Sequence, residues 1–160
     1  MSFQRLFRVM SMMAAFSVGV LPLSALADVV LTVHKLKSGT ETFTMEQLRQ
    51  YPAIIVETTT PWTDGEQRFV GIALHAVIGD VSSSDTISLR AVNDYVVSMS
   101  ASDVSTEFPM VAYERNSNAM SVRDKGPLWL IYPFDSKPEF RTETIFSRSI
   151  WQLVEITVGD

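Results

Sequence analysis

Cysteine and histidine, which supply zinc ligands, thiol nucleophiles and general bases, are scarce in this sequence. It contains no cysteine and only two histidines, His34 and His75, which lie far apart in the chain. A protein zinc site needs three or four ligands, most often cysteine or histidine. The sequence therefore offers no thiolate ligand and no thiol nucleophile, and it does not predict a zinc site.

A hydrolytic serine–histidine–aspartate site would have to use His34 or His75 as its base. His75 lies in an apolar segment, where a packed or capping histidine is the simpler interpretation. The chain has no Gly-x-Ser-x-Gly elbow, which presents the nucleophile in one large class of hydrolases. The acidic residues Asp135 and Glu139 lie in an ordinary charged loop. We therefore do not expect hydrolase activity.

Strands account for most of the elements that must position the remaining polar and aromatic side chains. Runs rich in β-branched and aromatic residues, some of them alternating with polar residues, favour strands. They predict strands at 29–33, 42–44, 54–59, 86–92, 95–99, 109–114, 127–133 and 150–158. Loops with turn-forming residues separate these runs, notably 61–67 and the tight turn Asn93-Asp94.

Two short helices are predicted among the strands. Thr44 is followed three residues later by Gln47, a capping box that starts a helix from Met45 to Tyr51. The apolar positions of Ile72–Ile78 suit a second helix, and Gly79 would close it. The sequence thus predicts an α+β domain that is mostly β.

The first 27 residues have the three-part layout of a secretory signal peptide. Arg5 and Arg8 are its only charged side chains, and small residues occupy the −3 and −1 positions, Ala25 and Ala27. The apolar run between them is about 13 residues long, short of the ~20 that a spanning helix needs. An uncleaved anchor is the alternative. We expect this segment to be removed on export and residues 28–160 to form a single domain.

The charge of the chain argues against a nucleic-acid partner. The formal net charge is −5, and it becomes −7 once Arg5 and Arg8 are removed with the leader. A basic patch is the electrostatic footprint of nucleic-acid binding, and no basic cluster occurs in this sequence.

Several short motifs occur in a recognisable order along the chain. Phe69–Leu74 reads aromatic-x-Gly-x-x-Leu, Ala91–Tyr95 ends a strand in a tight turn before tyrosine, and Gly126–Pro133 is an apolar segment bounded by glycine and proline. Their order resembles the sulfite oxidase fold, the oxidoreductase molybdopterin-binding domain, from about Phe43 to Ile156. Trp129 stands where that family usually has arginine.

One departure changes what this resemblance implies about function. Catalytic members place a cysteine thiolate on molybdenum just after the strand that corresponds to Ile54–Glu57, whereas here Thr58–Trp62 reads Thr-Thr-Thr-Pro-Trp. A hydroxyl cannot replace a soft thiolate on that metal. The resemblance therefore points to the cysteine-less periplasmic pterin-binding subgroup, the PruR-like proteins, and away from an enzyme.

Membership of that subgroup would imply a periplasmic protein whose pocket binds a free or molybdopterin-like pterin without a metal. It would also imply a membrane partner that makes or degrades cyclic di-GMP, and through it an effect on biofilm formation. A molybdopterin-dependent oxidoreductase with atypical metal ligation is the alternative, and a carrier with a vestigial pocket is a third.

A pterin is a flat ring with a guanidine-like edge, so it requires a stacking surface and hydrogen-bond acceptors. On this resemblance, Trp62 could stack on the ring, or it could fold onto the core instead. Asn93 and Asp94 could meet the ring edge, although Asp94 is first of all a turn former. Tyr95 could line the site or be an ordinary hairpin aromatic.

Two further charged residues are candidates on the same resemblance. Arg148 matches a basic position that faces the phosphate side of the cofactor in the family, although a solvated arginine is the alternative. Glu57 is the carboxylate beside the position of the missing cysteine. Trp129 and Trp151 lie in apolar strands and are expected in the core.

The leader yields the first testable prediction. Exported protein should begin at Asp28, because Ala25 and Ala27 satisfy the small-residue rule for cleavage. Intact mass or N-terminal sequencing of the exported form measures this directly. Retention of residues 1–27 in most molecules would contradict it.

Overall fold

The computed structural model describes residues 28–159; the predicted leader, residues 1–27, lies outside the described part. The strands are β1 (Val29–Lys35), β2 (Gly39–Thr44), β3 (Ile54–Thr59), β4 (Glu66–Ala73), β5 (Thr86–Ala91), β6 (Val96–Ser100), β7 (Met110–Arg115), β8 (Asn118–Ala119), β9 (Trp129–Ile131) and β10 (Leu153–Gly159). The α-helices are α1 (Met45–Leu48), α2 (Leu74–Ile78) and α3 (Glu143–Arg148). The expected α+β fold, mostly β, is confirmed.

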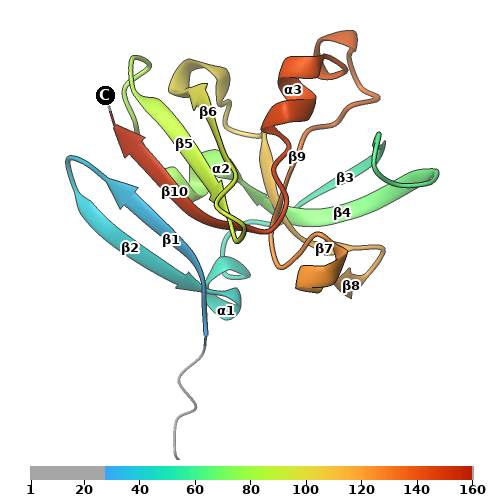
Figure 1. Cartoon of the computed structure of the whole chain (residues 1–160), viewed down its shortest axis with the longest axis horizontal. Coiled ribbons are helices and arrows are strands. Elements are labelled where there is room, and N and C mark those ends of the chain that lie inside the picture. The colour runs from blue at the N-terminus through green and yellow to red at the C-terminus, as the bar shows by residue number, and fades with distance from the viewer. Residues whose placement is uncertain (1–27, 160) are drawn as a thin grey trace, which may run out of the picture.

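The strands form two five-stranded sheets, shown in Figure 1. The first has the order β2-β1-β10-β5-β6, and the second has the order β3-β4-β7-β8 with β9 also paired to β7. Among the described strands, β1 and β10 form the one parallel pair, and all others are antiparallel. The first and last strands of the described chain therefore lie side by side inside the first sheet.

The two sheets are joined where the chain enters β10. Trp129 of β9 forms an isolated antiparallel bridge with Trp151. The N–H of Leu130 donates to the carbonyl of Ile150 at 2.9 Å, and the N–H of Leu153 donates to the carbonyl of Leu128 at 3.0 Å. Main-chain hydrogen bonds thus connect the edge of the second sheet to the centre of the first.

The capping box is present, and α1 is shorter than predicted. The N–H of Gln47 donates to the Thr44 hydroxyl at 3.2 Å, and the Gln47 side chain accepts from the N–H of Thr44 at 2.8 Å. The helix runs only from Met45 to Leu48, because a cap sets where a helix begins and leaves its end to tertiary packing.

The second predicted helix begins two residues late. Ile72 and Ala73 belong to β4, where they pair with Val111 and Met110 of β7. A side chain at Gly71 would lie 2.6 Å from the Cα of Ala112, so the two strands approach closely only because glycine stands there. Strand pairing at this close approach outweighs the local helix pattern.

Helix α3 was not predicted from the sequence. Its first turn is capped by Thr142, whose hydroxyl accepts from the N–H of Ile145 at 3.3 Å. Arg148, expected just before a strand, is the last residue of this helix, and the final strand starts at Leu153 rather than Ile150. The apolar run from Ile150 crosses between the sheets before it can join β10.

Asp135 connects the loop after β9 to the end of β3. Its carboxylate accepts from the N–H of Thr59 at 2.6 Å and from the Thr59 hydroxyl at 2.8 Å, and Arg141 donates to it at 2.5 Å. In return, the N–H of Asp135 donates to the buried hydroxyl of Thr58 at 3.1 Å. The expectation that Asp135 lies in an ordinary charged loop is wrong, since it anchors the segment that leads to Trp62.

These bonds make one contribution to the pH dependence of the stability. The hydrogen bond from the N–H of Thr59 is the largest cause that holds the pKa of Asp135 below its usual value, and the hydrogen bond from the Thr59 hydroxyl is the next. A carboxyl with a lowered pKa in the folded state stabilises the fold above its unfolded pKa of about 4. That contribution is lost as the pH falls through the lower, folded value.

Asp135→Asn should therefore lower the free energy of unfolding at pH 7 by about 1 kcal/mol, because the amide cannot accept both bonds from Thr59. Below pH ~4 the cost should shrink, since the carboxyl is protonated first in the unfolded chain and then, at lower pH, in the folded one. Thermal unfolding at pH 7 and at pH 3 measures the difference. Glu139→Gln, an exposed change in the same loop, is the matched control. A cost that is the same at both pH values would contradict the assignment.

Candidate functional site

A pocket of about 460 Å³ lies between α3 and the turn that joins β5 to β6, with the loop after β3 and the crossing before β10 completing its wall. Four aromatic residues line it: Trp62, Tyr95, Phe146 and Trp151. Polar side chains at its rim are Asn93, Glu143 and Ser147. The structure therefore brings together three of the residues predicted from the sequence, Trp62, Asn93 and Tyr95.

Trp62 lies at the centre of an aromatic cluster. Its ring centroid is 5.6 Å from that of Trp151 and 5.9 Å from those of Phe146 and Trp129, in edge-to-face or tilted arrangements. Such pairs add to the stability beyond the area they bury. Trp62 remains half-buried and lines the pocket, so it packs onto the core and also forms a wall of the site.

The loop of Trp62 is held by its own hydroxyls. Thr60, which is 8% exposed, accepts from the N–H of Trp62 at 3.1 Å and is hydrogen-bonded to Thr63 at 2.8 Å. Together with the bonds from Asp135 to Thr59, this fixes the entry and the turn of the loop. The indole is therefore positioned by the fold before any ligand arrives.

Glu143 is the carboxylate that lines the pocket. It lies in the first turn of α3, is exposed, and has no ion-pair partner among residues 28–159. Asn93, across the pocket, uses its side-chain oxygen to accept from the N–H of Tyr95 at 3.3 Å. The rim thus offers a free acceptor on one side and an amide on the other.

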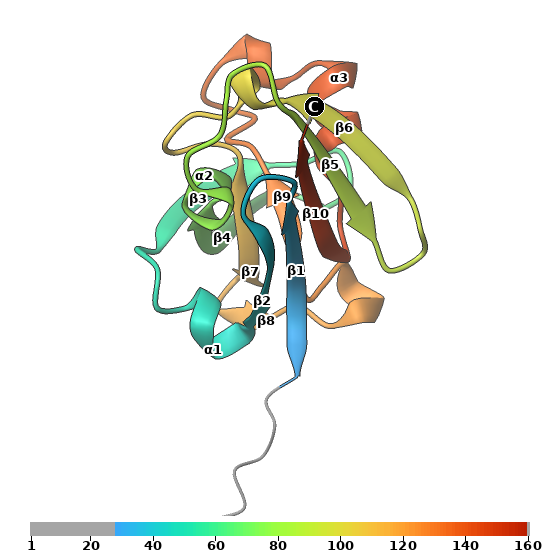
Figure 2. The ribbon, with the colours of Figure 1, turned by 90° about the vertical axis from the view of Figure 1, so that its left-hand side faces the viewer.

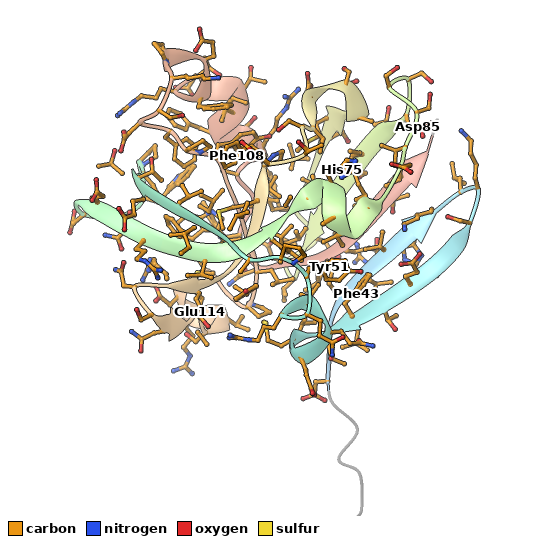
Figure 3. All side chains as sticks on the ribbon, turned by 180° about the vertical axis from the view of Figure 1, so that it is seen from behind. Phe43, Tyr51, His75, Asp85, Phe108 and Glu114 are labelled. Carbon is orange, nitrogen blue, oxygen red and sulfur yellow. The ribbon has the colours of Figure 1, made fainter. Side chains whose placement is uncertain are left out.

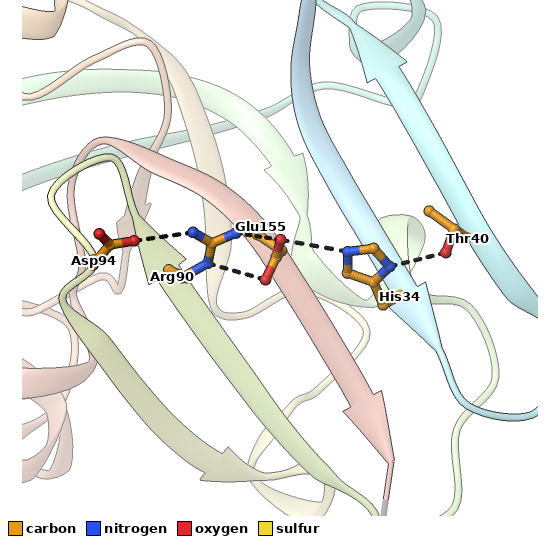
Figure 4. Close-up of polar contacts among 5 residues, drawn as sticks. All are labelled: His34, Thr40, Arg90, Asp94 and Glu155. Atoms are coloured by element: carbon orange, nitrogen blue, oxygen red, sulfur yellow. Dashed lines mark hydrogen bonds and ion pairs between the residues drawn. The ribbon is translucent and has the colours of Figure 1, made fainter.

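Asp94 does not line the pocket. It lies in the turn with a left-handed backbone, φ 63°, and its carboxylate is 3.0 Å from Nη1 of Arg90. Figure 4 shows the row that follows across the outer face of the first sheet: Arg90 forms two hydrogen bonds with Glu155, and His34 lies 3.4 Å from the same carboxylate. The bonds from Arg90 lower the pKa of Glu155. Asp94 therefore belongs to this row of charged residues, and its role is that of a turn former, the first of the two interpretations given above.

Glu57 and Arg148 also lie outside the pocket lining. Glu57 is exposed on β3, 3.8 Å from Arg68 on the neighbouring strand. Arg148 is mostly buried and pairs with Asp103 at 2.9 Å, beside the hydroxyl of Tyr132. Burial raises the pKa of that tyrosine to about 12. Both charged residues are engaged elsewhere in the fold.

Sequence reasoning missed Glu143, Phe146 and Ser147, because it did not predict α3. A signal was present: Thr142 can cap a helix, with glutamate in its first turn and Arg148 in its last. Trp129 is fully buried, as expected. Trp151 is half-buried and forms a wall of the pocket instead of lying wholly in the core.

Other hollows in the described part of the chain have fewer aromatic side chains in their lining. A groove of about 430 Å³ beside β2 and α1 has one aromatic pair, Phe43 and Tyr51, labelled in Figure 3. A hollow of about 360 Å³ near His75 is lined mainly by hydroxyls and small residues. Among residues 28–159 no three acidic or histidine side chains gather where they could hold a metal ion. No helix in that range is long and apolar enough to cross a membrane.

No protein-family model matches this sequence, and no curated protein matches it. Among solved structures, the sulfane dehydrogenase SoxCD from Paracoccus pantotrophus is similar in fold, with a TM-score of 0.60 and 16% sequence identity. The match covers 81% of this chain and 38% of that one, so the chain corresponds to well under half of the sulfane dehydrogenase chain. The sulfite-oxidase-like fold expected from the sequence is thus supported by a solved structure, and at this identity the likeness concerns the fold alone.

Proposed function

We propose that this protein is a non-catalytic binding protein whose pocket between α3 and the β5–β6 turn takes a flat heteroaromatic ligand of the pterin class. The observation that carries the proposal is the combination, at a single pocket, of four aromatic side chains with the carboxylate of Glu143, which has no ion-pair partner within residues 28–159. Its volume of about 460 Å³ lies within the range of small-molecule sites.

The chemistry of a pterin matches both parts of the site. Its ring can stack on or pack against Trp62, Tyr95 and Trp151, and aromatic pairs of this kind favour offset or edge-to-face contact. Its guanidine-like edge presents neighbouring N–H donors, which suit a carboxylate, because charge-assisted hydrogen bonds are stronger than neutral ones. Glu143 takes the acceptor role that the sequence had suggested for Asp94.

The residues at the position of the family's metal ligand do not fit a molybdenum site. Thr58 is buried, donates to the carbonyl of Thr59 at 3.3 Å and accepts from the N–H of Asp135. Thr60 is engaged with Thr63 and Trp62. These are hard hydroxyl groups already committed to the loop, and the chain has no thiolate to offer. We therefore favour binding over the alternative of an oxidoreductase with atypical ligation.

We further propose that the protein is exported to the periplasm and acts on a membrane protein that makes or degrades cyclic di-GMP. Export is supported by the leader sequence, and the type of partner by the resemblance to the PruR-like proteins. A ligand can transmit a signal only if it binds two states of the complex with different affinity.

The ligand prediction uses two rim variants. Glu143→Gln should weaken pterin binding about tenfold, or ~1.4 kcal/mol, because it removes the charge that the guanidine-like edge would meet. Tyr95→Ala should weaken binding similarly by removing an exposed aromatic wall. Titration followed by calorimetry or tryptophan fluorescence measures both constants. Trp62→Ala is a poorer probe, since that ring also supports the core.

Asp94→Asn is the matched control for the ligand experiment. It alters a carboxylate in the same rim turn as Asn93 and Tyr95, but one that points to Arg90. Its affinity for pterin should stay within about twofold of wild type, or ~0.4 kcal/mol. Equal losses in Asp94→Asn and Glu143→Gln, or no loss in either rim variant, would contradict the proposed site. Roughly one molybdenum per chain in protein from its native host would favour the oxidoreductase alternative.

The partner prediction follows from linkage. Pterin should change the affinity of the protein for its membrane partner, and the partner should change pterin affinity by the same factor, typically about 5- to 150-fold. Recovery of the partner from native membranes, with and without pterin, measures the first change. Recovery of no membrane protein, together with unchanged cyclic di-GMP output after gene deletion, would leave a carrier with a vestigial pocket as the better account.

A further inference from the structure

The strand β6 (Val96–Ser100) ends the first sheet, and one of its long sides has no neighbouring strand. Figure 2 shows it at the outer margin of that sheet. Three of the large apolar or aromatic residues that the structure leaves about half exposed gather at its beginning: Val92 at 51%, Tyr95 at 50% and Val96 at 49%. An open strand edge with apolar surface beside it can pair with another chain.

Main-chain hydrogen bonds on both sides of β6 establish its alternation. The N–H of Ala91 donates to the carbonyl of Tyr95 at 2.9 Å, and the N–H of Ala101 donates to the carbonyl of Asp85, also at 2.9 Å. In an antiparallel pair, hydrogen-bonded and non-bonded residue pairs alternate. The two bonded pairs at the ends therefore set the pattern for every residue between them.

By this alternation, Val97 and Met99 are the β6 residues bonded to Leu89 and Ile87 of β5. The residues between them, Val96 and Ser98, turn their N–H and C=O groups to the open side of the sheet, and so does the N–H of Ser100. None of these groups has a hydrogen-bond partner within residues 28–159. These unpaired main-chain groups can form hydrogen bonds with one additional strand.

The strand β6 differs from the other long edge strands in having no charged residue. The edge strand β2 carries Glu41, and the edge strand β3 carries Glu57. β6 reads Val-Val-Ser-Met-Ser, with neither a charged residue nor a proline. Charges and prolines are the usual means by which proteins keep strand edges apart, and like charges placed opposite each other are destabilising. β6 lacks that protection.

We propose that β6 pairs in antiparallel fashion with β6 of a second copy of this chain, about a two-fold axis at Ser98. In this register Ser98 faces Ser98, and Val96 faces Ser100, so that the open main-chain groups of one copy meet those of the other. Such an interface is self-complementary, as a two-fold dimer requires. The two sheets then continue as one across the axis.

Within β6 this register places no charged residue opposite another, because the strand reads Val-Val-Ser-Met-Ser. The strand is bounded by the turn at Asp94 and by the short 3-10 helix Ala101–Asp103, so the pairing is limited to these five residues. The contact is short, so the dimer should form reversibly and depend on concentration. This inference is independent of the pterin proposal and is tested without a ligand.

The absence of cysteine makes a sharp test possible, since any disulfide in a single-cysteine variant must join two copies. Bonded residues of an antiparallel pair lie about 5.5 Å apart at Cα, within the range that a disulfide spans. Ser98→Cys should form a covalent dimer under mild oxidation by dissolved oxygen at least ten times faster than Ser88→Cys. Ser88 is the matched control, because it faces Ser98 on β5 but is not at the edge.

Measurement of the molecular mass of the wild-type protein in solution provides a second, independent test. The mass should rise from one copy to two with increasing concentration, and Ser98→Lys should raise the dissociation constant at least tenfold by placing two ammonium groups at the axis. Unchanged thermal unfolding would show that this exposed change leaves the fold intact. A wild-type chain that stays monomeric up to about 1 mM overturns the proposal. Equal cross-linking rates at positions 98 and 88 also overturn it. The same holds if β6 pairs with a different protein and never with a second copy of this chain.

Discussion

The junction between Trp129 and Trp151 is the contact on which the rest of this structure depends. Main-chain bonds from Leu130 to Ile150 and from Leu153 to Leu128 tie β9 to the segment entering β10. Neither sheet covers its own apolar face, so each must be held against the other to bury it. The crossing provides that hold, and Lys125, 4.9 Å from the Trp151 ring, covers the indole with its ammonium group.

The pocket is a direct consequence of that junction. The crossing carries Trp151 to one wall, and Trp62 packs against it from the loop after β3. The two rings meet edge to face, an arrangement that aromatic pairs favour, and both line the hollow. The bonds from Asp135 to Thr59 hold the Trp62 loop from the other side. The site is therefore preorganised by contacts that also stabilise the fold, and its rim residues are the better targets for functional tests.

The β5–β6 hairpin separates two kinds of surface. Its inner side contributes Tyr95 to the pocket, while its outer side carries Arg90 in the row with Glu155 and His34. Asn93 and Tyr95 of the connecting turn line the pocket, whereas Asp94 between them has a left-handed backbone (φ 63°) and bonds to Arg90. Neighbouring residues of one turn therefore contribute to different surfaces. The remaining feature of the hairpin is its open edge, on which the proposed pairing rests.

The sequence by itself determined the local features: most strands, the capping box at Thr44 and Gln47, and the position of Trp62 in a loop, because periodicity and turn chemistry act over a few residues. It also determined the absence of thiolate chemistry. Only the tertiary structure decided that Ile72 joins a strand, that α3 supplies Glu143 and Phe146, and that Trp151 lines a pocket. These outcomes depend on contacts between segments far apart in the chain, such as β4 with β7 or Trp62 with Trp151. A short helix of this kind gains most of its stability from such packing, and local propensity alone does not report it.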